Sequence, residues 1–104
     1  MAGIIAQIWG MSRPRGHPPD RPYKDVGRRL VAVRMALGIA SQAELCRALN
    51  VLPSQWNQYE SGERRITVDV ALKLKMLYGI TIDYIYTGDP SGLPFRLHRQ
   101  IPAA

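Results

Sequence analysis

Apolar residues recur at helical spacing through most of residues 24–88. Val26, Leu30, Val33 and Leu37 fall at i, i+4, i+7 and i+11, and Gly38 follows them, which predicts a first helix that ends at the glycine. Seven of the eight prolines lie instead in the two flanks of this region. The pattern predicts an all-α fold with one compact domain between residues 23 and 88.

Four shorter helices are predicted after the first one. The second helix is expected over residues 41–49, with Leu45, Leu49 and either Ala43 or Cys46 facing inward, and the third over residues 53–61, with Trp56 and Tyr59 facing inward. The fourth is expected from Thr67 to Gly79, with Val70, Leu74 and Leu77 on its inward face, and the fifth over residues 82–86, with Ile82 and Ile85 facing inward. Thr67 and Thr81 are suited to cap the last two helices, because a threonine hydroxyl accepts a hydrogen bond from the free N–H groups of the first turn.

The second and third helices form the most informative pair. Ser41 stands at the start of the second helix and Glu44 follows three residues later, which is the spacing of a capping box. Between the two helices, Asn50-Val51-Leu52-Pro53 is a turn of the length that joins helices at a steep angle. A helix, a short turn and a second helix with polar residues on its outward face are typical of a DNA-reading helix-turn-helix.

The two flanks are predicted to lie outside the domain. Residues 12–22 carry a proline every few positions, so neither a helix nor a central strand can form there. We predict a basic, disordered N-terminal arm over residues 1–22, either a solvated tail or an arm that enters a DNA groove. Residues 1–10 are apolar but too short to span a bilayer, and we interpret them as an upstream extension of little functional weight rather than a membrane or partner anchor. Residues 89–104 are predicted to form a turn-rich tail with one helical turn at most.

Composition narrows the partner and the chemistry. The formal net charge of +6 favours a polyanionic partner, most often nucleic acid, although other classes of protein are equally basic. The one cysteine, Cys46, excludes an intrachain disulfide and fits a cytoplasmic location. His17 and His98 stand alone, so neither a metal site nor a nucleophile with its base can be assembled from them. We therefore predict no enzymatic activity, no cofactor and no metal.

Together these features give the chain a resemblance to the lambda-repressor-like, Cro-type (XRE) helix-turn-helix family. The runs that carry it are Ser41-Gln42-Ala43-Glu44-Leu45, Tyr59-Glu60-Ser61-Gly62, Tyr78-Gly79-Ile80-Thr81-Ile82-Asp83-Tyr84-Ile85 and the closing Gly88. The resemblance covers about residues 24–88. It implies a compact five-helix domain that binds double-stranded DNA in a sequence-specific manner, usually as a homodimer on a palindromic operator.

The resemblance also implies roles for individual residues. Those expected to read base edges are Ser54, Gln55, Asn57 and Gln58, and those expected to contact phosphates are Gln42, Ser61, Arg64 and Arg65. Glutamine can pair bidentately with adenine, and the free N–H groups at a helix start attract anions, so these residue types suit the roles. Arg34 is expected to form a structural ion pair with Glu60.

Two positions depart from the family pattern. Pro53 stands where relatives often carry a polar base-reading residue, so specificity is expected to shift towards Ser54 and Gln58. Trp56 replaces an aliphatic anchor, and we expect its ring to fill the space between the second and third helices while its N–H finds a partner.

Tyr84 and Tyr86 are the expected dimer interface, because the short fifth helix carries more apolar surface than a small core can bury. The alternative is that both tyrosines cover the core of their own domain.

These expectations lead to one function and one alternative. The first is a small prokaryotic or phage transcriptional regulator, with repression as the expected mode and the third helix in the major groove. The alternative is an antitoxin-like or protein-interaction module that acts through its tail and dimer surface. Removal of the residues after Gly88 should leave operator binding intact in the first case and abolish partner capture in the second.

Overall fold

The computed structural model describes residues 21–101, and within them the chain forms six helices and no strand. The helices are α1 (Lys24–Ala36), α2 (Gln42–Leu49), α3 (Pro53–Ser61), α4 (Val68–Tyr78), α5 (Ile82–Thr87) and α6 (Phe95–His98). The predicted all-α fold class is confirmed, with one helix more than the five expected. The arm predicted over residues 1–22 lies outside the described residues, except for its last two.

Side chains cap three of these helices where the sequence predicts it. The hydroxyls of Ser41, Thr67 and Thr81 accept hydrogen bonds from the backbone N–H three residues later, at 3.3, 3.3 and 3.0 Å. Asn50 ends α2 in the left-handed conformation with φ of 56°, which asparagine tolerates better than most residues. Local signals therefore account for the bounds of α2, α4 and α5.

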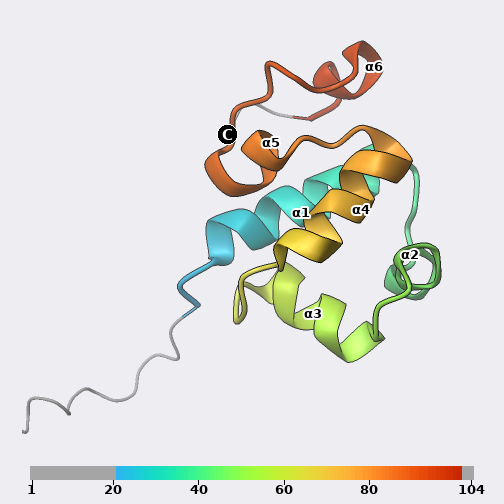
Figure 1. Cartoon of the computed structure of the whole chain (residues 1–104), viewed down its shortest axis with the longest axis vertical. Coiled ribbons are helices and arrows are strands. Elements are labelled where there is room, and N and C mark those ends of the chain that lie inside the picture. Colours follow the sequence, from blue (N-terminus) through green and yellow to red (C-terminus); the bar gives the residue numbers. More distant parts are fainter. Residues whose placement is uncertain (1–20, 102–104) are drawn as a thin grey trace, which may run out of the picture.

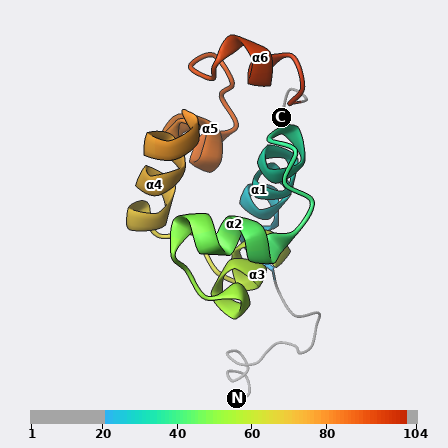
Figure 2. The same cartoon turned by 90° about the vertical axis from the view of Figure 1, so that its right-hand side faces the viewer.

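The helices pack so that α2 and α3 lie together at one end of the domain. α1 packs against α3 and α5, α2 packs against α3 and α4, and α4 packs against α5. Figures 1 and 2 show α2 and α3 at the lower end and α6 at the upper end. The helix-turn-helix pair is therefore far from the C-terminal helix.

Gly27 allows α1 and α3 to approach closely. A Cβ atom at this buried position would lie 2.4 Å from the carbonyl oxygen of Glu60 and 2.9 Å from that of Tyr59. At the same crossing, the backbone N–H of Tyr23 donates to the carbonyl of Gly62 at 3.1 Å. Only a residue without a side chain fits between the two backbones at this point.

The inward faces of α2 and α4 differ in part from those predicted. Cys46 is buried on α2, whereas Ala43, the other candidate, is exposed. On α4 the buried residues are Val70, Ala71 and Leu74, and Leu77 is 55% exposed. The expectation that Leu77 lies in the core is wrong, because Ala71 shifts the centre of the inward face and leaves Leu77 at its edge.

The segment after Gly88 belongs to the core instead of forming a free tail. Leu93, Leu97 and Ile101 are buried within the same hydrophobic cluster as the residues of the first five helices. They are four residues apart, the spacing at which one face of a helical turn is buried. The domain therefore extends beyond the boundary predicted at Gly88. The short helix α6 is the single helical turn that the sequence allowed in this segment.

The buried position of Leu97 yields a stability prediction. Leu97→Ala should lower the free energy of unfolding by about 2–5 kcal/mol, because it leaves a cavity in the core. Phe95→Ala is the matched control, since this side chain is 77% exposed and its loss should cost less than about 0.5 kcal/mol. Urea unfolding of both variants measures the difference. Equal, small losses would show that the segment after Gly88 does not stabilise the domain.

Candidate nucleic-acid interface

The outward face of α3 is fixed by the two aromatic residues on its inward face. Trp56 and Tyr59 are 0% and 2% exposed. At about 100° per residue, Ser54, Asn57 and Gln58 fall on the opposite side of the helix. Ser54 and Asn57 are exposed and Gln58 is half-buried. The structure therefore presents three of the four predicted base-reading residues on one free face.

Gln55, the fourth predicted base-reading residue, lies at the edge of this face. It lies only about 40° around the helix axis from Tyr59, because the two residues are four positions apart. Gln55 is half-buried, and its Nε2 donates a hydrogen bond of 2.6 Å to the hydroxyl oxygen of Tyr59. Part of its hydrogen-bonding capacity is thus used inside the protein.

The four predicted phosphate-binding residues occupy different environments. Arg64 and Arg65 are exposed in the turn after α3, and the Arg65 guanidinium lies 5.1 Å from the ring centroid of Tyr23. The hydroxyl of Ser61 donates to the carbonyl of Gln58 at 3.2 Å. Gln42, at the start of α2, donates from Nε2 to Glu60 Oε1 at 2.6 Å and keeps a second N–H. Only the two arginines carry a charge, and both are exposed to solvent.

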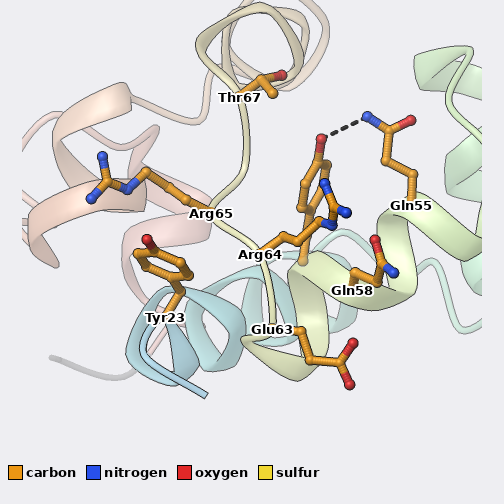
Figure 3. A pocket seen from close by; sticks show the side chains of 8 residues that line it. Tyr23, Gln55, Gln58, Glu63, Arg64, Arg65 and Thr67 are labelled. Carbon is orange, nitrogen blue, oxygen red and sulfur yellow. Dashed lines mark hydrogen bonds between the residues drawn. The ribbon is translucent and has the colours of Figure 1, made fainter. Parts of the chain in front are cut away.

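A cavity of about 430 Å³ opens beside α3, and we call it the α3 notch. Its walls come from the start of α1, from α3 and from the turn that follows α3. The lining residues are Tyr23, Gln55, Gln58, Tyr59, Glu63, Arg64, Arg65 and Thr67. Figure 3 shows Arg64 extending towards the Gln58 side and Arg65 extending the opposite way. The notch therefore joins the predicted base-reading face to the basic turn.

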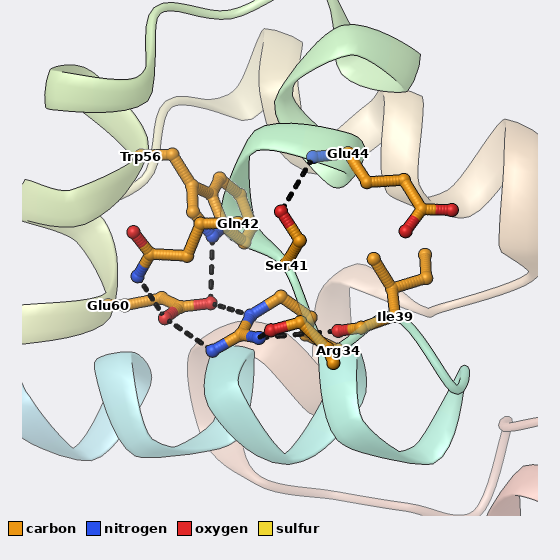
Figure 4. Close-up of polar contacts among 8 residues, drawn as sticks. Arg34, Ile39, Ser41, Gln42, Glu44, Trp56 and Glu60 are labelled. Carbon is orange, nitrogen blue, oxygen red and sulfur yellow. Dashed lines mark hydrogen bonds and ion pairs between the residues drawn. The ribbon is translucent and has the colours of Figure 1, made fainter.

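Glu60 lies behind the interface and accepts hydrogen bonds from α1, α2 and α3. Arg34 donates from Nε to Oε2 at 2.7 Å and from Nη2 to Oε1 at 3.1 Å. Gln42 bonds Oε1 as described above, and the indole N–H of Trp56 donates to Oε2 at 2.8 Å (Figure 4). The structure thus brings together Arg34 and Glu60, the pair expected from the sequence, and supplies the partner expected for the Trp56 indole.

The remaining donors of Arg34 hold the loop between α1 and α2. Its Nη1 donates to the carbonyl oxygens of Ile39 and Ala40 at 3.2 and 2.6 Å. The Arg34 and Glu60 side chains are only 11% and 5% exposed. Removal of one partner would leave the other charge buried and unpaired, which costs more than the pair itself contributes.

Hydrogen bonding decides the ionisation of this pair. Burial alone would raise the pKa of Glu60, but the hydrogen bonds from Arg34, Gln42 and Trp56 outweigh it and hold the pKa below its ordinary value. The hydrogen bond to Glu60 also raises the pKa of Arg34, against the opposing effect of burial. Both groups are therefore charged at neutral pH.

The expectation that Tyr84 contributes to a dimer interface is wrong. This residue is 1% exposed and belongs to the core of its own domain. Tyr86 is half-buried, and its hydroxyl donates to the carbonyl oxygen of Ile66 at 2.7 Å. Exposed apolar side chains are found instead on α4, at Val68, Leu72, Met76 and Leu77. The position of Tyr84 agrees with the alternative interpretation, in which the tyrosines cover the core of their own domain.

The part of the chain that the structure describes gives little support for a metal site, a membrane-spanning helix or a reactive cysteine. Residues 21–101 hold no group of three or more His, Cys, Asp or Glu residues that could bind a metal ion. None of the helices in this range is long and apolar enough to cross a membrane. His98 is exposed, whereas His17 lies outside the described residues. Cys46 is buried, and burial raises the pKa of its thiol, which makes it a poor nucleophile.

Two contacts that shape this interface were not predicted from the sequence. The Gln55–Tyr59 hydrogen bond joins residues four apart on one helix, so the spacing could have indicated it. The Gln42–Glu60 hydrogen bond joins residues from different helices and has no local signal. Both contacts change the role expected of a glutamine from binding DNA alone to binding within the protein as well.

Comparison with known families agrees with this geometry. A family model described as a helix-turn-helix domain matches residues 25–83, which is more than half of the 104 residues. The matched range contains α2, α3 and the turn between them. Neither the curated proteins nor the solved structures contain a match to this chain. The family match confirms the helix-turn-helix resemblance drawn from the sequence.

The buried carboxylate of Glu60 yields a prediction with a defined pH dependence. Glu60→Gln should lower the free energy of unfolding by about 3–5 kcal/mol at pH 7, because Arg34 would remain buried without a counter-charge. A depressed pKa stabilises the fold above the unfolded-state value of about 4.3, and this contribution is lost as the pH falls through the folded-state pKa. The difference between wild type and variant should therefore shrink below about pH 4.

Urea unfolding between pH 3 and pH 7 measures this effect. Glu63→Gln is the control, because Glu63 is exposed and should contribute less than about 0.5 kcal/mol. A difference between wild type and Glu60→Gln that stays constant with pH would contradict the assigned ionisation.

Proposed function

We propose that this chain, which belongs to the helix-turn-helix domain family, binds double-stranded DNA in a sequence-specific manner and regulates transcription. The observation that carries the proposal is the free polar face of α3, formed by Ser54, Asn57 and Gln58 beside the basic turn at Arg64 and Arg65. A helix of this kind enters the major groove, where each base pair presents a distinct pattern of donors and acceptors. The +6 net charge of the chain suits a polyanionic partner.

Gln58 is the proposed principal base-reading residue. Its side-chain amide offers a donor and an acceptor together, which match N7 and N6–H of adenine. Among residues 21–101 its side chain has no protein hydrogen-bond partner, in contrast to Gln55. Ser54 and Asn57 are proposed to contact neighbouring bases, because both are exposed on the same face.

Phosphate contacts are proposed at both ends of the helix pair. Gln42 stands at the first turn of α2, where free backbone N–H groups and the helix dipole favour an anion. Arg64, Arg65 and Ser61 are proposed to contact the backbone beside α3. These contacts position the domain without selecting a sequence.

We further propose that two copies bind a palindromic operator and that occupancy of the site represses transcription. The resemblance to dimeric regulators supports this arrangement, which would place two α3 helices about 34 Å apart on the same face of the DNA. Tyr86 is the one predicted interface tyrosine with exposed surface, and its hydroxyl also bonds Ile66 inside the domain. A change at Tyr86 would therefore disturb both the fold and any interface.

Capture of a protein through a free tail is less well supported. Leu93, Leu97 and Ile101 are part of the core, so these apolar residues cannot also form a free binding segment. Truncation after Gly88 would remove core residues and would not separate the two functions. Point changes at exposed residues of α6 are the better means to test a protein partner.

In-vitro selection of duplexes from a random pool tests the proposed function directly. Enrichment of one sequence motif supports specific DNA binding, and enrichment of an inverted repeat supports the two-fold arrangement as well. Recovery of no motif, with equal retention of all sequences, would reject sequence-specific binding.

The proposed role of Gln58 predicts a loss of specificity. Gln58→Ala should weaken binding to the selected duplex by about 1–3 kcal/mol and relax the preference at one base pair, while binding to random duplex stays almost unchanged. Gln100→Ala, at an exposed position beyond α6, is the control. Titrations on both duplexes measure the effect, and an equal loss on each would exclude base reading by Gln58.

Arg64 should behave in the opposite manner. Arg64→Ala should weaken binding to every duplex and reduce the slope of log affinity against log salt by about one, as expected when one phosphate contact is lost. Arg96→Ala removes an exposed arginine from α6, at the far end of the domain, and should leave the slope unchanged. An unaltered slope in Arg64→Ala would assign Arg64 to the solvated surface.

A further inference from the structure

The hydroxyl group of Tyr59 has an unused donor at the wall of the α3 notch. Tyr59 is 2% exposed, yet it lines this cavity. Its oxygen accepts the hydrogen bond from Gln55 Nε2 at 2.6 Å. A phenol also carries one proton to donate, and no protein acceptor for that proton is found within residues 21–101. Because the side chain lines an open cavity, this proton can be donated to an acceptor that enters the notch, in place of water.

The other walls of the notch suit an anion. Arg64 and Arg65 contribute two positive charges, and Glu63 contributes the one negative charge among the lining residues. Arg65 lies over the ring of Tyr23, which restrains it at one side of the cavity. A neutral donor that points into a cavity with net positive charge is a combination that recognises phosphate oxygens.

Gln55 determines the direction of the Tyr59 proton. Because the Gln55 amide N–H occupies an acceptor position of the phenol oxygen, the hydroxyl proton must turn away from Gln55. Gln55 itself is half-buried at the edge of the outward face of α3. Its geometry therefore suits the orientation of Tyr59 better than the reading of a base.

We infer that the α3 notch binds one backbone phosphate of the DNA, with Tyr59 as a buried hydrogen-bond donor, Arg64 as the charge and Gln55 as the residue that positions the Tyr59 hydroxyl. This inference rests on the proposed DNA binding and deepens it. It moves Gln55 from the base-reading set to the backbone-contacting set. The notch lies beside Gln58, so the phosphate would belong to the wall of the groove that α3 enters.

Tyr59→Phe in the full chain tests the role of the hydroxyl. The variant keeps the aromatic ring, which packs edge-on against Trp56 with 6.0 Å between the ring centroids, so the fold should be retained. Thermal unfolding checks this. We expect about a 10-fold loss of affinity on the selected duplex and on random duplex alike, the scale of one hydrogen bond to a charged group. The salt slope should stay unchanged, because a neutral hydroxyl displaces no counterion.

Two further variants complete the test. Tyr78→Phe is the matched control, because Tyr78 is a half-buried tyrosine on the last turn of α4 and does not line the notch. Gln55→Ala should weaken binding in the same direction as Tyr59→Phe, and the double variant should bind no worse than Tyr59→Phe, since both changes act on one hydrogen bond. A loss confined to the selected duplex, or no loss in Tyr59→Phe, would overturn the inference.

Titration with inorganic phosphate separates this site from the proposed DNA binding. In the full-length wild type we expect saturable chemical-shift changes at the backbone amides of Arg64 and Arg65, and we expect them to be lost in Tyr59→Phe. Shifts that are identical in both proteins, or absent from the wild type, would reject the phosphate site even if DNA binds. Saturable shifts in a protein that binds no duplex would instead reject the proposed function and retain the site.

Discussion

The helix-turn-helix geometry depends on one buried carboxylate. Glu60 accepts hydrogen bonds from Arg34 of α1, from Gln42 of α2 and from Trp56 of its own helix, at 2.6–3.1 Å. Each donor comes from a different place in the sequence, so the carboxylate can be satisfied only when α1, α2 and α3 adopt one relative arrangement. Burial makes this requirement strict, because an ionised carboxylate that lost these partners would be strongly destabilising.

The same carboxylate connects the core to the surface proposed to face DNA. Gln42 uses one amide N–H for Glu60 and keeps another for an anion at the start of α2. On α3, Trp56 and Glu60 are four residues apart and both point away from the proposed DNA face, which fixes how Ser54 and Asn57 project from it. The orientation of the α3 face and that of the first turn of α2 are therefore set by one group.

The sequence predicted those features that depend on neighbouring residues. Caps at Ser41, Thr67 and Thr81, together with helical spacing, were sufficient for the bounds of α2, α4 and α5. Features that depend on distant residues could not be predicted in the same way. Nothing local distinguishes Leu97 from a surface residue of a short tail, because its burial depends on the core assembled by earlier helices. The close approach at Gly27 likewise arises only when α3 crosses α1.

Gln55 illustrates why side-chain roles are harder to predict than helix bounds. Four polar residues on α3 looked equivalent in the sequence, yet the buried side of the helix is centred between Trp56 and Tyr59, and only residues opposite that centre are fully free. Gln55 donates a hydrogen bond to the hydroxyl of Tyr59, whereas Ser54 and Asn57 make no such bond. In the proposed complex, one helix thus divides its polar residues between two tasks: those in the middle of the outward face are available to bases, and Gln55 at the edge positions the hydroxyl inferred to contact the DNA backbone.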